Sequence, residues 1–116
     1  MVRKAADCSV ELREHMREGD GVVQITNFVQ KPELYDKGRL FGKITLEPGC
    51  SIGYHVHEKD SELFYILKGT AEYNDNGVMT TVSAGDVAIT PMGGGHSIAN
   101  HSGETVELIA LIVYAE

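Results

Sequence analysis

The sequence predicts an all-β protein whose strands pack as an antiparallel sandwich or barrel with little helix. It contains 13 glycines and three prolines in 116 residues, and no long stretch has the periodicity of an amphipathic helix. Turn signals divide it into roughly eight to ten short strand-like runs. The last run, Thr105 to Tyr114, is apolar on both faces and therefore needs a second sheet or another subunit over its outer side. A chain of this length holds one hydrophobic core, so we expect a single domain.

The amino-terminal part has the weakest pattern. We expect an N-terminal arm at residues 1–21, followed by the barrel domain at residues 22–116. Ser9 is a candidate cap for a short helix from Val10 to Glu18, with Gly19 just after its end. The basic start is not followed by an apolar segment, so it does not resemble a signal peptide.

Proline, glycine and asparagine residues bound the expected strands. Pro48-Gly49 forms a turn, and Asp75-Asn76-Gly77 is a strong signal for a hairpin between two neighbouring strands. Gly85 and Gly103 mark two later turns in the same way. In order, the expected strands are 22–29, 39–46, a strand ending at 57, 63–67, 70–74, 78–82, 87–90, 96–100 and 105–114.

The pair His55 and His57 is separated by one residue, so both side chains lie on one face of a strand. Glu62 follows after a short polar turn and opens the next strand, which brings its carboxylate beside the two imidazoles. His96 belongs to a second stretch, residues 85–100. Three imidazoles and a carboxylate suit a divalent transition ion. We therefore expect the four residues to form one metal site.

Two spacing patterns contain these residues. The first is Gly-x5-His-x-His-x4-Glu-x6-Gly over residues 49–69, and the second is Gly-x5-Pro-x-Gly-x2-His-x3-Asn over residues 85–100. They resemble, in order and with every position present, the two motifs of the cupin superfamily. The resemblance implies a double-stranded β-helix, the cupin jelly-roll barrel, with the metal held inside by the same four residues. The chain is most similar to short single-domain cupins of the conserved-barrel type.

Four ligands on an octahedral ion leave two positions for water, substrate or dioxygen, and the donor set suits manganese, iron, cobalt, nickel or zinc. We expect a metal-dependent enzyme acting on a small polar metabolite bound directly at the metal, as a dioxygenase, decarboxylase, lyase or sugar isomerase. The alternative is a metal-containing module that binds or senses a small ligand without turnover. No Asp, Glu or free His is clearly placed as a general acid or base, so the catalytic residues stay unassigned.

Other residues have expected positions around the site. By strand alternation, Phe64, Ile66 and Ile98 lie on the same face as the ligands and should form an apolar pocket floor. Tyr54 lies on the opposite face and should point away from His55. Long polar side chains on the strands could anchor a substrate, and the candidates are Gln24, Asn27, Arg39 and Lys43. Residues expected to have surface or structural positions are His15, Gly93, Asn100 and His101.

Charge and apolar surface indicate the kind of partner. The formal net charge is −7 and basic residues form no cluster, which argues against nucleic acid or an anionic membrane. Cys8 and Cys50 match no disulfide framework, as in a cytoplasmic protein with free thiols. The strand at 63–67 and the last strand both carry apolar residues on their outer faces, so we expect a homodimer in addition to a small-molecule ligand.

Overall fold

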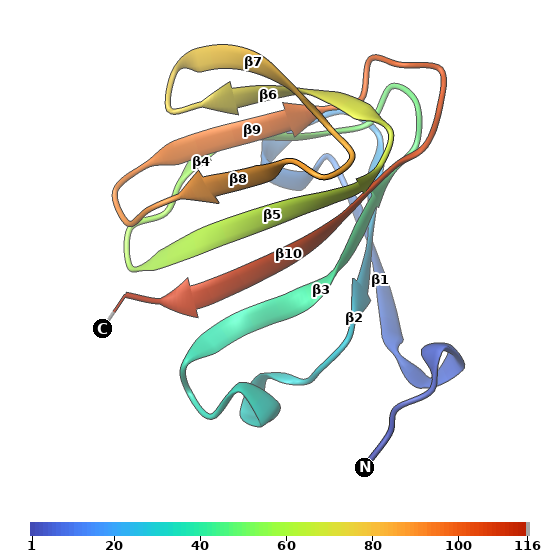
Figure 1. The fold of residues 1–116 in the computed structure, drawn as a ribbon, viewed down its shortest axis with the longest axis vertical. Helices are drawn as coiled ribbons and strands as arrows, with labels where there is room; N and C mark the ends of the chain where they lie inside the picture. Colours follow the sequence, from blue (N-terminus) through green and yellow to red (C-terminus); the bar gives the residue numbers. More distant parts are fainter. Residues whose placement is uncertain (116) are drawn as a thin grey trace.

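The computed structural model describes residues 1–115. Two antiparallel sheets pack face to face, which confirms the predicted all-β jelly-roll barrel (Figure 1). One sheet has the strand order β1-β2-β3-β10-β5-β8, and the other has the order β4-β9-β6-β7. The strands are β1 Ser9–Glu14, β2 Val22–Asn27, β3 Gly38–Leu46, β4 Ser51–Val56, β5 Asp60–Lys68, β6 Thr70–Asp75, β7 Val78–Ser83, β8 Val87–Thr90, β9 Gly95–Ala99 and β10 Val106–Tyr114.

Helical structure is limited to short 3-10 turns, as the glycine-rich composition predicts. Within residues 1–115 these are η1 Ala5–Asp7, η2 Met16–Glu18 and η3 Lys31–Leu34. No helix in this part of the chain has the length and apolar character needed to cross a membrane.

The predicted helix over Val10 to Glu18 is wrong. Ser9–Glu14 is instead the edge strand β1, which pairs antiparallel with β2. This segment alternates polar and apolar residues with period two, and the outer edge of β2 supplies hydrogen-bonding partners for it. Val10, Leu12 and Met16 form only part of an apolar helix face, so the strand pattern is the stronger of the two. The boundary between residues 1–21 and 22–116 stays a prediction.

Apolar side chains from both sheets fill the barrel interior. The buried members include Val23, Ile25, Ile44, Leu46, Ile52, Phe64, Ile66, Ile98, Val106 and Leu108. β10 lies between β3 and β5, so its inner residues face the second sheet, and this position accounts for the apolar residues on its inner face. Cys50 packs against this core, and both Cys8 and Cys50 are free thiols.

Asn100 holds together the turns at one end of the barrel. It is fully buried, and its Nδ2 donates to the carbonyl oxygens of Leu46 at 2.8 Å and Glu104 at 2.7 Å. Its Oδ1 accepts from the backbone N–H of Ser102 at 3.0 Å. These hydrogen bonds satisfy otherwise unpaired backbone groups, so the residue has the structural role expected from its place in the second motif.

Candidate metal centre

The four predicted ligands lie together inside the barrel. β4 and the residue after it carry His55 and His57, β9 carries His96, and Glu62 reaches them from β5 in the opposite sheet. The Nε2 atom of His96 lies 3.2 Å from the Nε2 atoms of both His55 and His57. The Oε1 atom of Glu62 lies 3.1 Å from His57 Nε2 and 3.0 Å from His96 Nε2. All four donor atoms lie within 4.8 Å of one another.

A β-bulge turns the histidines of β4 inward. The register of β4 against β9 shifts between Ile52 and His55, so that Gly53 and Tyr54 lie opposite a single residue of β9. The extra residue reverses the alternation of side chains. Ile52 and His55 therefore share the inner face, His57 follows two residues later, and Tyr54 is exposed, as predicted.

Two of the imidazoles are oriented by oxygen acceptors at their other ring nitrogen. The Nδ1 atom of His55 lies 2.8 Å from the carbonyl oxygen of Gly53, which can only accept, so this ring carries its proton on Nδ1. The Nδ1 atom of His57 lies 2.6 Å from Oδ1 of Asp60. Both rings therefore present Nε2 to the common centre, as metal-binding histidines do.

Hydrogen bonds at one ring nitrogen and an aromatic ring stacked on its face hold the third imidazole, His96. Its Nδ1 atom lies 2.8 Å from the hydroxyl of Tyr73 and 2.9 Å from the hydroxyl of Thr90. The ring of Phe64 stacks on it with a centroid separation of 5.0 Å. Burial raises the pKa of Tyr73 to about 12, so its hydroxyl stays neutral next to His96.

The electrostatics of the cluster favour an ionised Glu62 and a neutral His55. Burial alone would raise the pKa of the Glu62 carboxyl, but hydrogen bonds from His57 and His96 outweigh burial and hold this pKa below its usual value. The hydrogen bond to Glu62 raises the pKa of His57, against the effect of burial and with a contribution from Asp60. Burial lowers the pKa of His55, which keeps it in the unprotonated form that binds metals.

The donor set fits a divalent transition ion. Ligand atoms about 2.1 Å from an ion and at right angles to one another lie about 3 Å apart. Glu62 Oε1 lies 3.0 and 3.1 Å from the Nε2 atoms of His96 and His57, and the Nε2 atom of His96 lies 3.2 Å from those of His55 and His57, so these separations match that spacing. Unprotonated nitrogens at this distance repel one another unless a proton or a cation lies between them. The four residues could therefore hold one ion.

Asp60 links His57 to an arginine at the adjoining cavity. Its Oδ2 atom accepts from Nε of Arg39 at 2.8 Å, while its Oδ1 atom faces His57. Burial opposes ionisation of Asp60, but the hydrogen bonds to Arg39 and His57 keep its pKa below the usual value. The register of β3 against β10 shifts between Gly38 and Leu40, which makes Arg39 the extra residue of a second β-bulge. That bulge lets Arg39 line the cavity beside the cluster.

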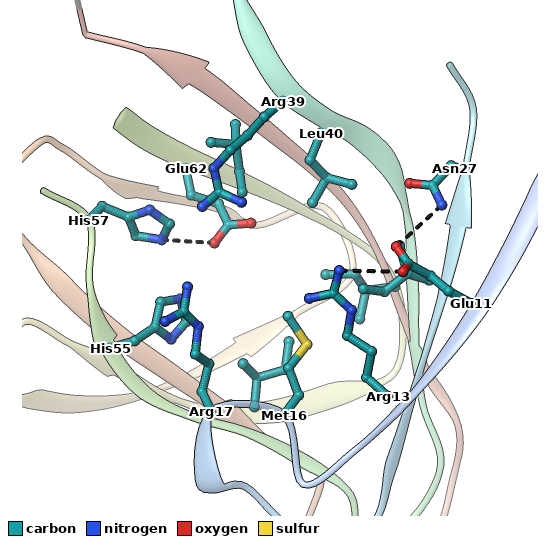
Figure 2. A pocket seen from close by; sticks show the side chains of 14 residues that line it. Glu11, Arg13, Met16, Arg17, Asn27, Arg39, Leu40, His55, His57 and Glu62 are labelled. Atoms are coloured by element: carbon teal, nitrogen blue, oxygen red, sulfur yellow. Dashed lines mark hydrogen bonds and ion pairs between the residues drawn. The ribbon is translucent and has the colours of Figure 1, made fainter. Parts of the chain in front are cut away.

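A cavity of about 100 Å³ adjoins the cluster (Figure 2). Its apolar wall consists of Met16, Ile25, Leu40, Ile44, Ile52 and Ile112. Its polar wall consists of Glu11, Arg13, Arg17, Asn27 and Arg39, together with the ligands His55, His57 and Glu62. This volume is far below the roughly 300–1,000 Å³ of pockets for drug-sized ligands, so the cavity suits a ligand of a few heavy atoms.

Three arginines make the wall of this cavity basic. Arg39 is paired with Asp60, and Nη2 of Arg13 lies 3.3 Å from Oε2 of Glu11. Within residues 1–115, Arg17 forms no ion pair with a carboxylate. In Figure 2 its guanidinium extends from η2 toward the end of the cavity where the histidines lie.

The candidate anchors predicted from the sequence divide into two groups. Asn27 and Arg39 line the cavity. Gln24 and Lys43 are not among the lining residues, and Nζ of Lys43 lies 3.6 Å from Oε1 of Glu107.

The predicted pocket floor is wrong. Phe64, Ile66 and Ile98 face inward and are buried, as their parity requires, but they pack in the core and do not line the cavity. Parity identifies the inner face of a strand but not how far along the barrel a residue lies. The apolar wall comes instead from β2, β3, β4, β10 and η2.

Sequence reasoning also missed several residues of the site. Glu11, Arg13 and Arg17 lie in the segment that was expected to be a helix, so no strand pairing placed them at the cavity. The sequence places Asp60 only in the short polar turn between His57 and Glu62. Its position three residues after His57 is the signal that could have identified it, because a carboxylate commonly orients a metal-binding imidazole.

Comparisons with known proteins agree with this fold and this cluster. Residues 42–114 match the family model described as Cupin domain. The chain is 37% identical over 113 residues to an oxalate-binding protein of Thermotoga maritima, covering 97% of this chain and 93% of that protein. The crystal structure of a predicted oxalate decarboxylase from the same organism has a TM-score of 0.93 at 37% identity, covering 98% of this chain and 99% of that chain.

A more distant structure shares the fold alone. It is the cupin domain of an XRE family transcriptional regulator from Enterobacter cloacae, with a TM-score of 0.69 at 20% identity, covering 81% of this chain and 98% of that chain. The family match extends over most of this chain and includes all four residues of the cluster. The chain therefore belongs to the cupin family.

Proposed function

We propose that this cupin binds one divalent transition ion through four residues and holds a small dicarboxylate, such as oxalate, next to that ion. The ligands of the ion are His55, His57, Glu62 and His96. The observation that carries the proposal is the convergence of these donor atoms beside a small cavity whose polar wall contains three arginines. The name of the Thermotoga maritima relative, an oxalate-binding protein, supports the choice of ligand.

A bound ion would supply a positive centre that attracts and polarises a carboxylate oxygen of the ligand. Manganese, iron, cobalt, nickel and zinc are all candidates, since the donor set does not select among them. Two acceptors in the chain turn the imidazoles toward the ion: Gly53 orients His55, and Asp60 orients His57. Glu62 contributes one negative charge and therefore leaves a divalent centre with one net positive charge.

The cavity wall favours a compact anion over a neutral or cationic ligand. Arg39 keeps its terminal nitrogens available, because only Nε is paired with Asp60. Apolar residues form the other wall of the cavity, and electrostatic attraction next to apolar surroundings is stronger than in bulk solvent. A small carboxylate is the ligand that matches this combination of size and charge.

A second candidate function is decarboxylation of the bound dicarboxylate, and the position of Glu11 favours it. Glu11 lines the cavity and accepts hydrogen bonds from Arg13 at 3.3 Å and Asn27 at 3.4 Å. Decarboxylation of oxalate breaks its carbon–carbon bond, releases carbon dioxide and places one proton on the remaining carbon to give formate. A carboxylate at the cavity could take up a proton from solvent and pass it to that carbon. No comparable observation favours a dioxygenase, a lyase or a sugar isomerase.

We also propose that two copies associate through the outer face of the six-stranded sheet. Tyr65 and Leu67 on β5 and Val87 and Ile89 on the neighbouring β8 are exposed apolar residues. A contiguous apolar patch on a sheet face is typical of an interaction surface. A second copy of the chain would cover it with a matching patch, as twofold symmetry requires.

The metal and the ligand are tested on the same preparations. Elemental analysis after loading with single ions should give one ion per chain, and calorimetry should detect oxalate binding only in the loaded protein. His96→Ala removes a ligand and should lose both. His101→Ala is the matched control, since His101 is exposed at the surface and should retain both.

Product analysis then separates the two candidate functions. Formate that appears as oxalate is consumed would identify a decarboxylase, whereas bound oxalate that is recovered unchanged would identify a binding protein. Loaded wild-type protein that binds no oxalate would refute the proposed ligand, and a chain that takes up no ion would refute the metal centre.

A further inference from the structure

Arg17 reaches the cavity from a backbone segment with an unusual conformation. His15, Arg17 and Glu18 are non-glycine residues with φ angles of 50°, 54° and 65°. Left-handed backbone is unfavourable for residues with a Cβ, and it persists where the surrounding structure imposes it, which is often at a functional site. The segment therefore needs a structural cause and is a candidate for a role in the site.

The structural cause is a close contact between this segment and β4. An ideal Cβ on Gly53 would overlap the carbonyl oxygen of Arg17, and one on Gly19 would overlap the carbonyl oxygen of Ser51. The backbone N–H of Asp20 donates to Oγ of Ser51, and the backbone N–H of Ser51 donates to the carbonyl oxygen of Asp20, both at 2.8 Å. Backbone therefore packs directly on backbone, which fixes the point from which the Arg17 side chain starts.

The charges around the cavity leave Arg17 available for a ligand. Arg39 is compensated by Asp60, and Arg13 is compensated by Glu11. Arg17 has no carboxylate partner among residues 1–115, and it is exposed at the cavity wall. A divalent centre with one carboxylate ligand carries one positive charge, and Arg17 adds a second. Two uncompensated positive charges match a dianion better than a monoanion.

We infer that Arg17 selects the ligand class by binding the second carboxylate of a dianion whose first carboxylate lies at the metal centre. The inference rests on the proposed function, and it goes further by assigning discrimination between dianions and monoanions to one residue. A guanidinium can donate two parallel hydrogen bonds to a carboxylate. A ligand that lacks the second carboxylate leaves those donors unpaired, which is an effective basis for rejecting it.

The test compares oxalate with glycolate, which has the same two-carbon skeleton but a hydroxymethyl group in place of one carboxylate. Both are titrated by calorimetry into zinc-loaded protein. Arg17→Asn removes the guanidinium, and asparagine is among the residues that adopt left-handed backbone most readily. We expect the Kd of Arg17→Asn for oxalate to rise about 10- to 100-fold, because hydrogen bonds to a charged group are lost. Its Kd for glycolate should change less than about threefold.

Two further variants control for charge and folding. Arg17→Lys keeps the charge without the two parallel donors and should recover part of the oxalate affinity. Lys43→Gln removes a cation that lies outside the cavity and should leave both affinities within about twofold of wild type. Metal content and thermal unfolding are measured for each variant, and both should match wild type because Arg17 is exposed.

Failure of this inference is distinguishable from failure of the proposed function. Wild-type protein that does not bind oxalate refutes the proposed function and the inference with it. Wild-type protein that binds oxalate, with an Arg17→Asn variant that keeps the same preference over glycolate, refutes only the role of Arg17. An equal loss of affinity for both ligands also refutes it, because Arg17 would then attract anions without distinguishing them.

Discussion

Replacement of Gly53 by alanine tests the close contact that positions Arg17. Gly53 has a φ that any residue adopts, so the backbone itself tolerates alanine. The added Cβ would overlap the carbonyl oxygen of Arg17, and it would lie 2.9 Å from the carbonyl carbon of Arg17 and 3.1 Å from the backbone nitrogen of Gly19. All of these atoms belong to the backbone, so no side-chain rotation relieves the overlap.

The expected cost follows from the kind of clash. Insertion of a methyl group into a packed region that must shift its backbone costs about 1–3 kcal/mol. For a chain of this length each kcal/mol lowers Tm by about 4 °C, so we expect Gly53→Ala to unfold about 4–12 °C below wild type in a thermal melt. The segment of residues 15–19 should move away from β4, and the Kd for oxalate should rise toward the value of Arg17→Asn.

The control for this substitution is Gly103→Ala. Gly103 has no atom within 4 Å of its ideal Cβ and no left-handed φ. The Tm of the Gly103→Ala variant and its Kd for oxalate should therefore both match wild type. The reasoning is refuted if Gly53→Ala matches wild type in both measurements. A loss of metal content in Gly53→Ala would show that β4 moves in place of the segment, which would also contradict the expectation.

Three further predictions concern the metal site and the assembly. Asp60→Asn should weaken zinc binding about 10- to 100-fold in a chelator competition assay, because Asp60 orients His57. The folded-state pKa of Asp60 lies below its usual value, so its contribution to stability is present above about pH 4 and is lost as the pH falls through the lower folded-state pKa. Urea unfolding of metal-free protein between about pH 5 and 2 should therefore show a shallower loss of stability in Asp60→Asn than in wild type. In sedimentation velocity at tens of micromolar, wild type should be a dimer and Ile89→Lys a monomer; a wild-type monomer would refute the proposed interface.

The ligand cluster could be predicted from the sequence because most of it is local. His55, His57 and Glu62 lie within eight residues on two strands joined by a short turn, so alternation and turn length are sufficient to place them together. Their spacing also matches a family motif, which supplied the position of His96 in the fold. Strand existence was predictable for the same reason, since each strand from β2 to β10 is bounded by turn residues or by a change of pattern.

The strand β1 and the cavity positions of Arg13 and Arg17 could not be predicted in this way, because they depend on distant parts of the chain. Residues 9–14 form a strand only because β2 presents an edge to them. Arg39 was a candidate anchor because of its long polar side chain, but its position at the cavity depends on the bulge of β3 against β10, which nothing in the local pattern indicates. Gly53 is different, since an isolated glycine in a strand pattern is a signal for a bulge or for a close backbone contact, and it marks both here.

Two residues connect the metal ligands with the arginines, which gives a reason to expect that ion and anion bind cooperatively. The carbonyl oxygen of Gly53 accepts a hydrogen bond from His55, and the backbone of Gly53 packs against the backbone of Arg17. Asp60 contacts both His57 and Arg39. An ion that fixes the two imidazoles therefore also fixes both arginines before the anion arrives, which lowers the entropy lost on binding. Coupling between two binding equilibria is reciprocal. Oxalate should accordingly raise the affinity for the ion by the same factor by which the ion raises the affinity for oxalate, and chelator competition with and without oxalate measures that factor directly. Equal affinities in the two conditions would contradict this coupling, and with it the expectation that oxalate binds only in the loaded protein.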